Sequence, residues 1–211
     1  MKSVRIVNYT KKIKGNIILD NINYTFEKGK IYGIIGRNGS GKTMLLRAIC
    51  GLIFPDNGEV YIDDKQLHKD ISFPDNCGVI IENSELLPNF SGFENLKILS
   101  KIKKTASDND IIFALETVGL EPQNKKKVKA YSLGMKQRLS IAQAIFENPE
   151  LLLMDEPTNA LDEKGVDMIR NILQKFRDND AIVLIASHNK EDIEILADEI
   201  INISDGKIIA N

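Results

Sequence analysis

The sequence predicts an α/β fold in which a mostly parallel central sheet is flanked by helices. Short apolar runs alternate along the chain with segments of helical spacing, and each run has the length of a strand buried on both faces. Parallel strands need crossover segments between them, so this alternation is typical of a parallel sheet. The apolar runs are residues 31–35, 78–81, 151–154 and 181–186.

The composition is that of an ordinary globular protein, and it excludes several classes. Of the 211 residues, 43% are hydrophobic and 27% are charged, which argues against wholesale disorder. The longest strictly apolar run, 181–186, is far shorter than the roughly 20 residues of a membrane-spanning helix. A net charge of −2 lacks the basic excess that nucleic-acid binding usually requires, so we expect no nucleic-acid partner. Two cysteines, Cys50 and Cys77, do not make a disulfide scaffold.

The N-terminal part of the chain predicts strands, which we expect to form an antiparallel β subdomain. Apolar and polar residues alternate over 4–8 and 17–26, as in strands with one buried face, and 55–64 is also strand-like. A glycine-rich loop follows the buried run 31–35. Residues 42–50, directly after this loop, have the apolar spacing of a helix.

Residues 83–131 predict a helical insertion subdomain within a single domain that spans residues 1–211. The segments 93–103 and 108–118 have helical character, and the chain then returns to the alternation of helix and strand. The remaining helices are predicted over 132–148, with one apolar stripe, and over 163–176.

The glycine-rich loop between the strand 31–35 and the following helix matches the pattern G-x-x-x-x-G-K-[ST] of a P-loop. Glycines let the backbone curl so that its N–H groups point at phosphate oxygens, and the following helix adds its positive N-terminal end. Lys42 is placed to reach the β- and γ-phosphates, and the hydroxyl of Thr43 is placed to bind Mg²⁺. A P-loop NTPase fold is therefore predicted. The loop comprises Gly36, Arg37, Asn38, Gly39, Ser40, Gly41, Lys42 and Thr43.

Two acids end the buried run 151–154 and complete a nucleotide-hydrolysis motif of the Walker B type. Parallel strands bring their carboxyl ends to one edge of the sheet, so Asp155 is expected beside the P-loop. Asp155 would hold Mg²⁺, directly or through water, and Glu156 is the candidate to polarise the attacking water. A strand that merely ends in solvated acids is the simpler interpretation, but the P-loop upstream disfavours it.

Three further motifs make the chain resemble the ABC ATPases over essentially its whole length. Residues 131–135 (Y-S-L-G-M) resemble the ABC signature, whose usual form is L-S-G-G-Q, and Ser132 lies 23 residues before Asp155. Residues 159–162 (N-A-L-D) resemble the D-loop. His188, after the strand 181–186, resembles the switch histidine that contacts the γ-phosphate.

The resemblance implies roles for residues outside the P-loop. Ser132, as the N-cap of a helix, and Gly134, which allows close approach, would form a second anion site. In ABC proteins this site faces a nucleotide held by the partner's P-loop, and Asp162 of the D-loop also lies at the nucleotide. The implied catalytic residues are Glu156, His188 and Lys42.

Two positions depart from the ABC pattern. The aromatic residue that stacks on adenine in this family aligns with Ile13, which offers apolar contact at best, and Tyr9 is the nearest aromatic upstream. The glutamine of the Q-loop aligns with Glu82, which we therefore carry as a candidate Mg²⁺ ligand together with Thr43 and Asp155. The I-E and Y-S-L-G-M variants are similar to those of bacterial exporter ATPases of the bacitracin and lantibiotic resistance type.

The resemblance implies an ATP- and Mg²⁺-dependent ATPase subunit of an ABC transporter of the exporter type. One P-loop and one signature make half of a catalytic unit, so a second ATPase subunit, identical or paralogous, is implied. Transmembrane permease subunits would dock around residues 82–99, with Leu86, Leu87 and Phe90 as apolar contacts. The N-terminus lacks the apolar segment of a secretory signal, so a cytoplasmic location at the inner face of the cell membrane is expected.

Two alternatives stay open from the sequence. A soluble ABC-type ATPase acting on a macromolecule usually carries two ATPase units or a long coiled coil, and neither is visible here. A P-loop kinase for a small metabolite would need an acceptor-binding lid, and it would need neither the signature nor His188.

Overall fold

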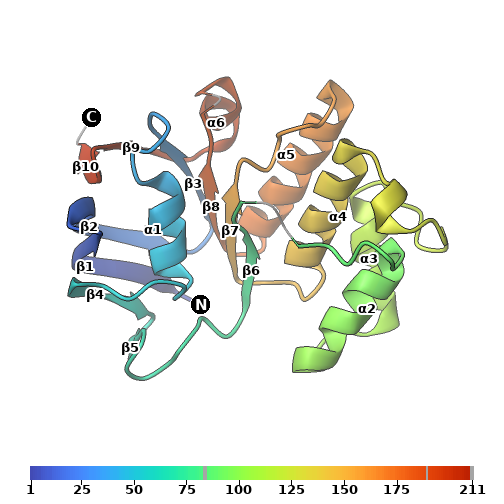
Figure 1. The fold of residues 1–211 in the computed structure, drawn as a ribbon, viewed down its shortest axis with the longest axis horizontal. Coiled ribbons are helices and arrows are strands. Elements are labelled where there is room, and N and C mark those ends of the chain that lie inside the picture. The colour runs from blue at the N-terminus through green and yellow to red at the C-terminus, as the bar shows by residue number, and fades with distance from the viewer. Residues whose placement is uncertain (83–84, 189, 210–211) are drawn as a thin grey trace.

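The computed structural model describes residues 1–82, 85–188 and 190–209 and arranges them around two β-sheets (Figure 1). The strands are β1 (Ser3–Ile13), β2 (Asn16–Glu27), β3 (Lys30–Ile35), β4 (Asn57–Ile62), β5 (Lys65–Gln66), β6 (Cys77–Ile80), β7 (Leu151–Asp155), β8 (Ile182–Ala186), β9 (Glu199–Ser204) and β10 (Lys207–Ile209). The helices are α1 (Lys42–Ile49), α2 (Gly92–Lys103), α3 (Asp108–Thr117), α4 (Leu133–Ile145), α5 (Glu163–Asp178) and α6 (Lys190–Leu196), with a 3₁₀ turn at Val128–Ala130.

The central sheet has the strand order β10-β9-β3-β8-β7-β6, and all neighbours except β10 and β9 pair in parallel. The predicted mostly parallel sheet is confirmed. Every residue of β8 is buried, as are the first four of β7, because helices cover one face and the second sheet with α1 covers the other. The carboxyl ends of β3, β7 and β8 meet at one edge, which places the loops after them together.

The N-terminal sheet has the order β2-β1-β4-β5 and is antiparallel throughout, as predicted. Helix α1 lies between it and the central sheet, with β1, β2 and β4 on the outer side (Figure 1). Leu45, Leu46 and Ile49 of α1 are fully buried in this layer. The helix that begins at the P-loop is thus clamped between two sheets.

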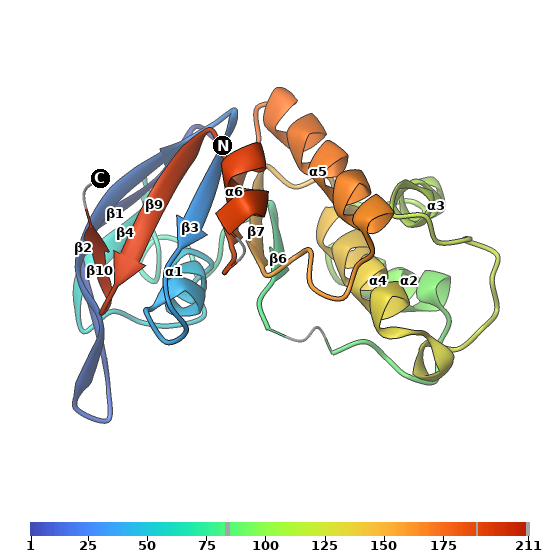
Figure 2. The same cartoon turned by 90° about the horizontal axis from the view of Figure 1, so that it is seen from above.

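The other face of the central sheet is covered by α4, α5 and α6, with α2 and α3 outside them (Figure 2). Leu139 and Ala142 of α4 are fully buried, and Phe146 just after it is almost so. The helix predicted over 132–148 ends at Ile145, because Asn148 takes a left-handed conformation before Pro149.

The sequence analysis assigned no element after residue 186, yet α6 and the β9–β10 hairpin lie there. The hairpin has a local signal, the dipeptide Asp205-Gly206 with positive φ at both residues, which is typical of a tight β-turn. Its turn is anchored by a hydrogen bond from the Gly206 N–H to the Ser40 carbonyl oxygen (2.9 Å). The C-terminal hairpin therefore supports the P-loop.

Candidate nucleotide site

The P-loop connects β3 to α1, and its glycines are required by close packing and by backbone conformation. Gly41 occupies the N-cap position of α1 with φ of 111°, a region that disfavours any side chain. A Cβ atom on Gly36 would lie 2.3 Å from the carbonyl oxygen of Ile203 and 2.5 Å from Ser40 Oγ. Larger residues at these positions would push the loop away from the sheet.

Lys42 is buried, and its ammonium group folds back over the loop. Nζ donates to the carbonyl oxygens of Gly36 (2.9 Å) and Arg37 (3.3 Å). These carbonyls hold the ammonium charge of Lys42 above the loop. A bound phosphate could accept hydrogen bonds from the ammonium group in place of the carbonyls or together with them. The loop borders a cavity of about 730 Å³, which is also lined by Ile35, His188, Lys190, Asn202, Ile203, Ser204, Asp205 and Ile209.

Ser40 supplies an independent indication that this loop fits a nucleotide. Its side chain is buried, and its Oγ has no hydrogen-bond partner in the structure. A buried hydroxyl without a partner costs free energy unless a ligand satisfies it. With the ammonium of Lys42 close by, the residues present fit the phosphate groups of ATP.

Thr43 and Asp155 meet as the motifs predict. Thr43 Oγ1 donates to Asp155 Oδ2 at 2.6 Å, across 112 residues of sequence. Burial is the main cause that raises the pKa of Asp155; the hydrogen bond from Thr43 opposes it, and the nearby charge of Glu156 adds to it. A hydroxyl and a carboxylate are hard oxygen ligands, so the pair fits Mg²⁺.

Glu156 and His188 also meet. Glu156 Oε1 accepts from the backbone N–H of His188 (2.9 Å) and lies 2.7 Å from His188 Nδ1, while Oε2 accepts from Ser187 Oγ (3.1 Å). The φ of Glu156 is 51°, an uncommon conformation for this residue type. This bend turns its carboxylate toward the loop after β8.

Gln137 of α4 also reaches this region, and the sequence analysis did not single it out. Its Nε2 donates to the carbonyl oxygen of Pro157 at 2.9 Å. The hydrogen bond ties α4 to the segment that follows Glu156. The local sequence around Gln137 does not predict this contact, because the partner is a backbone atom 20 residues away.

Glu82 lies near the site but is paired elsewhere. Its Oε1 is 2.8 Å from the guanidinium of Arg47, in the last turn of α1, and its side chain is 61% exposed. The charge of Glu82 still contributes, as the smallest cause, to raising the pKa of Asp155. The sequence motifs do not predict this pairing of Glu82 with Arg47.

Ile13 lies at the end of β1 beside the hairpin turn, with its side chain 40% exposed. Tyr9 is 1% exposed, and its hydroxyl donates to the carbonyl oxygen of Ile53 at 3.1 Å. Tyr9 is therefore a core residue, and its ring offers no free face to an adenine. Ile13 remains the candidate at this position.

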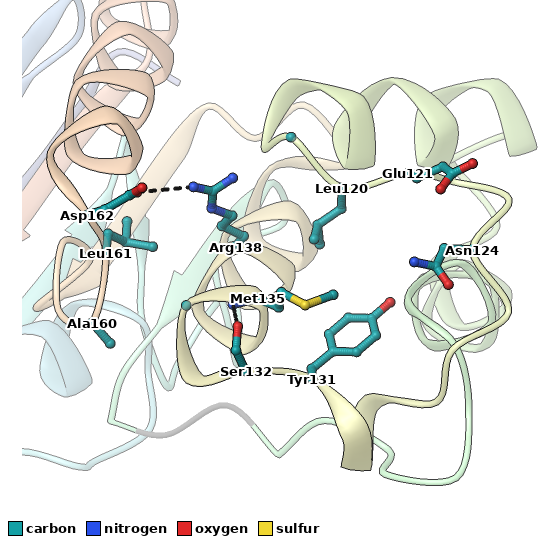
Figure 3. Close-up of a pocket in the computed structure, with 12 residues that line it drawn as sticks. Leu120, Glu121, Asn124, Tyr131, Ser132, Met135, Arg138, Ala160, Leu161 and Asp162 are labelled. Atoms are coloured by element: carbon teal, nitrogen blue, oxygen red, sulfur yellow. Dashed lines mark hydrogen bonds and ion pairs between the residues drawn. The ribbon is translucent and has the colours of Figure 1, made fainter.

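The signature residues line a different cavity, of about 530 Å³ (Figure 3). Ser132 is the N-cap of α4, where its Oγ accepts from the Met135 N–H at 3.2 Å. A Cβ atom on Gly134 would lie 3.1 Å from the carbonyl oxygen of Ala160, so the first turn of α4 packs closely on the segment 159–162. The lining residues are Gly119, Leu120, Glu121, Asn124, Tyr131, Ser132, Gly134, Met135, Arg138, Ala160, Leu161 and Asp162.

Asp162 caps α5. Its Oδ1 accepts from the Gly165 N–H at 3.0 Å and lies 3.3 Å from Arg138 NH2. The cavity of the signature shares no lining residue with the cavity of the P-loop. Within one chain the structure therefore brings Lys42, Thr43, Asp155, Glu156 and His188 together and leaves Ser132, Gly134 and Asp162 apart from them.

Among the residues that the structure describes, no helix combines the length and the apolar character needed to cross a membrane.

The sequence matches a known family over most of its length. Residues 19–159 match the family model described as "ABC transporter". The chain is 58% identical over 205 residues to the uncharacterized ABC transporter ATP-binding protein YybJ of Bacillus subtilis (strain 168), covering 97% of this chain and 94% of that protein.

Two relatives carry transport names. The bacitracin transport ATP-binding protein BcrA of Enterococcus faecalis is 40% identical, over 96% of this chain and 66% of that protein. The lantibiotic transport ATP-binding protein SrtF of Streptococcus pyogenes is 37% identical, over 98% of this chain and 89% of that protein. Both names contain the compounds, bacitracin and lantibiotics, of the ATPase types that the sequence motifs resembled.

Two solved structures of the bacterial ABC transporter cassette MJ0796 have the same fold. Its dimeric structure has a TM-score of 0.89 at 27% identity and covers 98% of this chain and 97% of that chain. A dimeric post-hydrolysis state bound to ADP and Pi has a TM-score of 0.87 at 28% identity, with coverage of 98% and 97%. The chain therefore belongs to the ABC transporter family, as an ATP-binding subunit with ATPase activity.

Proposed function

We propose that this chain powers an ABC exporter by dimerising around ATP and working on separate membrane subunits. The observation that carries the proposal is the separation of the P-loop cavity from the signature cavity within one chain. Residues 36–40 and His188 line the first cavity, whereas Ser132, Gly134 and Asp162 line the second, so two chains placed head to tail would complete two sites. The dimers formed by the similar cassette support this arrangement.

The proposed roles within one half-site follow from the hydrogen bonds above. The P-loop N–H groups and Lys42 bind the phosphates, and Thr43 with Asp155 holds Mg²⁺. When bound, the metal neutralises phosphate charge. Glu156 orients and polarises the attacking water, and His188, beside it, contacts the γ-phosphate.

The second half-site would come from the partner subunit, which is a copy of this chain or a paralogue. Ser132 and Gly134 lie at the N-terminus of α4, where free N–H groups and the helix dipole favour an anion. Their cavity opens beside the segment 159–162 (Figure 3). In the proposed dimer it receives the γ-phosphate of the nucleotide on the partner's P-loop.

The membrane subunits would dock at a groove of about 560 Å³ between the start of α4 and the residues before α2. Leu86 and Leu87 line it as expected, and Leu133, which is 72% exposed, adds a third apolar contact that the sequence analysis missed. Phe90 is exposed, but it does not line the groove. Lys129, Lys136 and Glu85 also line it, so a partner helix with an apolar face flanked by charged residues fits.

With this docking, the chain would lie in the cytoplasm at the inner face of the cell membrane. Because relatives are named for bacitracin and lantibiotic transport, we propose export of a peptide antibiotic or a similar amphipathic compound. Within residues 1–82, 85–188 and 190–209, no feature favours action on a macromolecule in place of transport.

Glu156→Gln tests the proposal, because glutamine keeps a hydrogen-bond acceptor but cannot take up a proton. The variant should bind ATP, hydrolyse it at least about 100-fold more slowly, and accumulate as an ATP-bound dimer, since a general base contributes roughly 10²–10⁴-fold. Light scattering with Mg-ATP should show doubled mass.

The matched control is Lys42→Ala in the Glu156→Gln background. It should stay monomeric, because ATP affinity falls by at least about tenfold, or ~1.4 kcal/mol, once the charge-assisted contact is lost. A Glu156→Gln protein that stays monomeric in saturating ATP would contradict the shared-site proposal.

A further inference from the structure

We propose that Arg138 is a positioning residue that holds the D-loop segment 159–162 in register with the signature. Arg138 lies in the middle of α4, and its guanidinium points to the N-cap of α5, where NH2 lies 3.3 Å from Asp162 Oδ1 (Figure 3). Its side chain is 26% exposed, so most of it packs between elements. The sequence analysis gave this arginine no role.

Two glycines from different elements make room for this guanidinium. A Cβ atom on Gly119, just after α3, would lie 3.1 Å from Arg138 NH1. A Cβ atom on Gly165, in the first turn of α5, would lie 3.3 Å from Arg138 NH2. Both of these hypothetical Cβ atoms would lie closer to the guanidinium than ordinary van der Waals distance. The guanidinium of Arg138 therefore fills the gap between the end of α3 and the start of α5.

Asp162 serves two groups at once. Its Oδ1 accepts from the Gly165 N–H, which caps α5, and also faces Arg138. A charged acceptor shared in this way fixes the first turn of α5 relative to α4. The segment before it is fixed at its other end, where Gly134 packs against the carbonyl of Ala160.

The two ties lie on the wall of one cavity. Ser132, Gly134, Ala160, Arg138 and Asp162 all line the signature cavity (Figure 3). A phosphate bound at the start of α4 would therefore be sensed by the segment 159–162 through Arg138. This last step rests on the proposed dimer, whereas the positioning of the segment in the single chain does not.

Two variants separate the ion pair from the helix cap. Arg138→Gln removes the charge, and Asp162→Asn removes the partner charge but keeps an N-cap residue of equal quality. The control is Arg170→Gln, which breaks the ion pair with Asp167 (3.1 Å) elsewhere on α5. In the monomer without ATP, hydrogen exchange of the amides of 159–166 should accelerate about two- to fivefold in both test variants, the range of a partly exposed ion pair.

Exchange within α1 should not change in either variant, and the ATP affinity of the Arg138→Gln monomer should equal that of the wild type. Arg170→Gln should leave the amides of 159–166 unaffected. Unaltered exchange of these amides in both Arg138→Gln and Asp162→Asn would overturn the inference. So would an equal acceleration throughout the chain, because that result marks a general loss of stability.

The second arm uses the Glu156→Gln background. A two-fold symmetric dimer contains two copies of Arg138, so Arg138→Gln should raise the ATP-dependent dimer dissociation constant by roughly four- to 25-fold. If the parent Glu156→Gln protein fails to dimerise, the proposed function is refuted. The hydrogen-exchange result then decides by itself whether Arg138 positions the segment 159–162. A parent that dimerises, with Arg138→Gln dimerising equally well, would refute the inference that the residue couples the two sites.

Discussion

Single residues at the nucleotide site differ in whether the fold satisfies their polar groups. Ser40 Oγ is buried without a partner, and Lys42 is held only by carbonyls of its own loop. Asp162 and Glu82 instead have their carboxylates engaged by Arg138 and Arg47. The first two are prepared for a ligand, whereas each of the other two already has one carboxylate oxygen paired with an arginine.

Ile13 predicts weak discrimination between ATP and GTP, because no aromatic face is available at this position. Ile13→Tyr should tighten ATP binding about fivefold, since an aromatic stack contributes around 1 kcal/mol. Fluorescence titration with both nucleotides measures this.

Ile17→Tyr is the matched control. Ile13 pairs with Asn16 and Ile17 pairs with Lys12, so the side chains of the two isoleucines lie on opposite faces of the hairpin. A strong ATP preference in the wild type would mean that another group recognises the base.

Glu82 and Arg47 predict opposite shifts of the acid limb of the ATPase pH profile. Ionised Asp155 is needed for the proposed metal contact, and a neighbouring negative charge raises its pKa. Arg47→Gln leaves Glu82 uncompensated, so the acid limb should move to higher pH. Glu82→Gln should move it to lower pH, and the double variant should lie between them.

The Mg²⁺ requirement decides whether Glu82 also joins the metal. A changed Mg²⁺ dependence in Glu82→Gln would support a ligand role. If the pH profile and the Mg²⁺ dependence both match the wild type, in the isolated subunit and in the assembled transporter, Glu82 is not a site residue.

At the level of elements, the helices outside the sheet are held by their caps as much as by burial. Helix α2 begins with a complete capping box, in which the Ser91 hydroxyl accepts from the Glu94 N–H and Glu94 accepts from the Ser91 N–H. Lys127, from the loop before the 3₁₀ turn, adds an ion pair to Glu94 at 2.9 Å. One carboxylate thus joins the start of α2 to the segment that leads into the signature.

Glu94 predicts a pH-dependent contribution to stability. The hydrogen bond from the Ser91 N–H, the ion pair with Lys127 and the Ser91 hydroxyl lower the pKa of Glu94 from 4.5 to about 2. Because the folded pKa is depressed, the stabilisation is complete above 4.5 and is lost as pH falls from there through about 2.

Urea unfolding of Glu94→Gln and the wild type checks this. The variant should unfold at lower urea at pH 7, and the difference should narrow below pH 4.5, where Glu94 of the unfolded chain becomes protonated. Lys127→Gln should reproduce part of the loss. A difference that stays constant with pH would show that packing of the side chain, not its charge, is responsible.

For the whole molecule, the central sheet lies between the N-terminal sheet with α1 on one face and the remaining helices on the other. The nucleotide motifs lie at the carboxyl ends of β3, β7 and β8, while the signature lies on α4, on the helical side (Figure 2). The proposed docking groove lies between α4 and the segment before α2. A partner in this groove would therefore act on the helical side, while α1, which begins at the P-loop, stays clamped between the two sheets.

The groove predicts that Leu87→Asp weakens association with the membrane subunit by at least about tenfold, since burying a leucine contributes ~1.5–3 kcal/mol. ATP binding by the isolated subunit should be unchanged. Co-purification with the co-expressed membrane subunit measures the effect. Ile102→Asp, at an exposed position of α2 outside the groove, is the control and should co-purify normally. Equal co-purification of both variants would place the docking surface elsewhere.

The sequence by itself determined the features that depend on residue type at short range. The glycines, Lys42 and Thr43 of the P-loop, and the acids after β7, have a spacing that the chemistry of phosphates and Mg²⁺ requires. Buried strands were visible because both of their faces are apolar, and α1 because its apolar residues follow the helical period.

Only the tertiary structure decided which distant side chains meet. Arg47 and Glu82 are brought together because α1 packs beside β7, the neighbour of β6. No local sequence pattern predicts that these two residues pair. Arg138 reaches Asp162 because two glycines, one just after α3 and one in the first turn of α5, leave space for its guanidinium. Such pairings depend on strand order and helix packing, which set distances between residues that local propensity and periodicity do not encode.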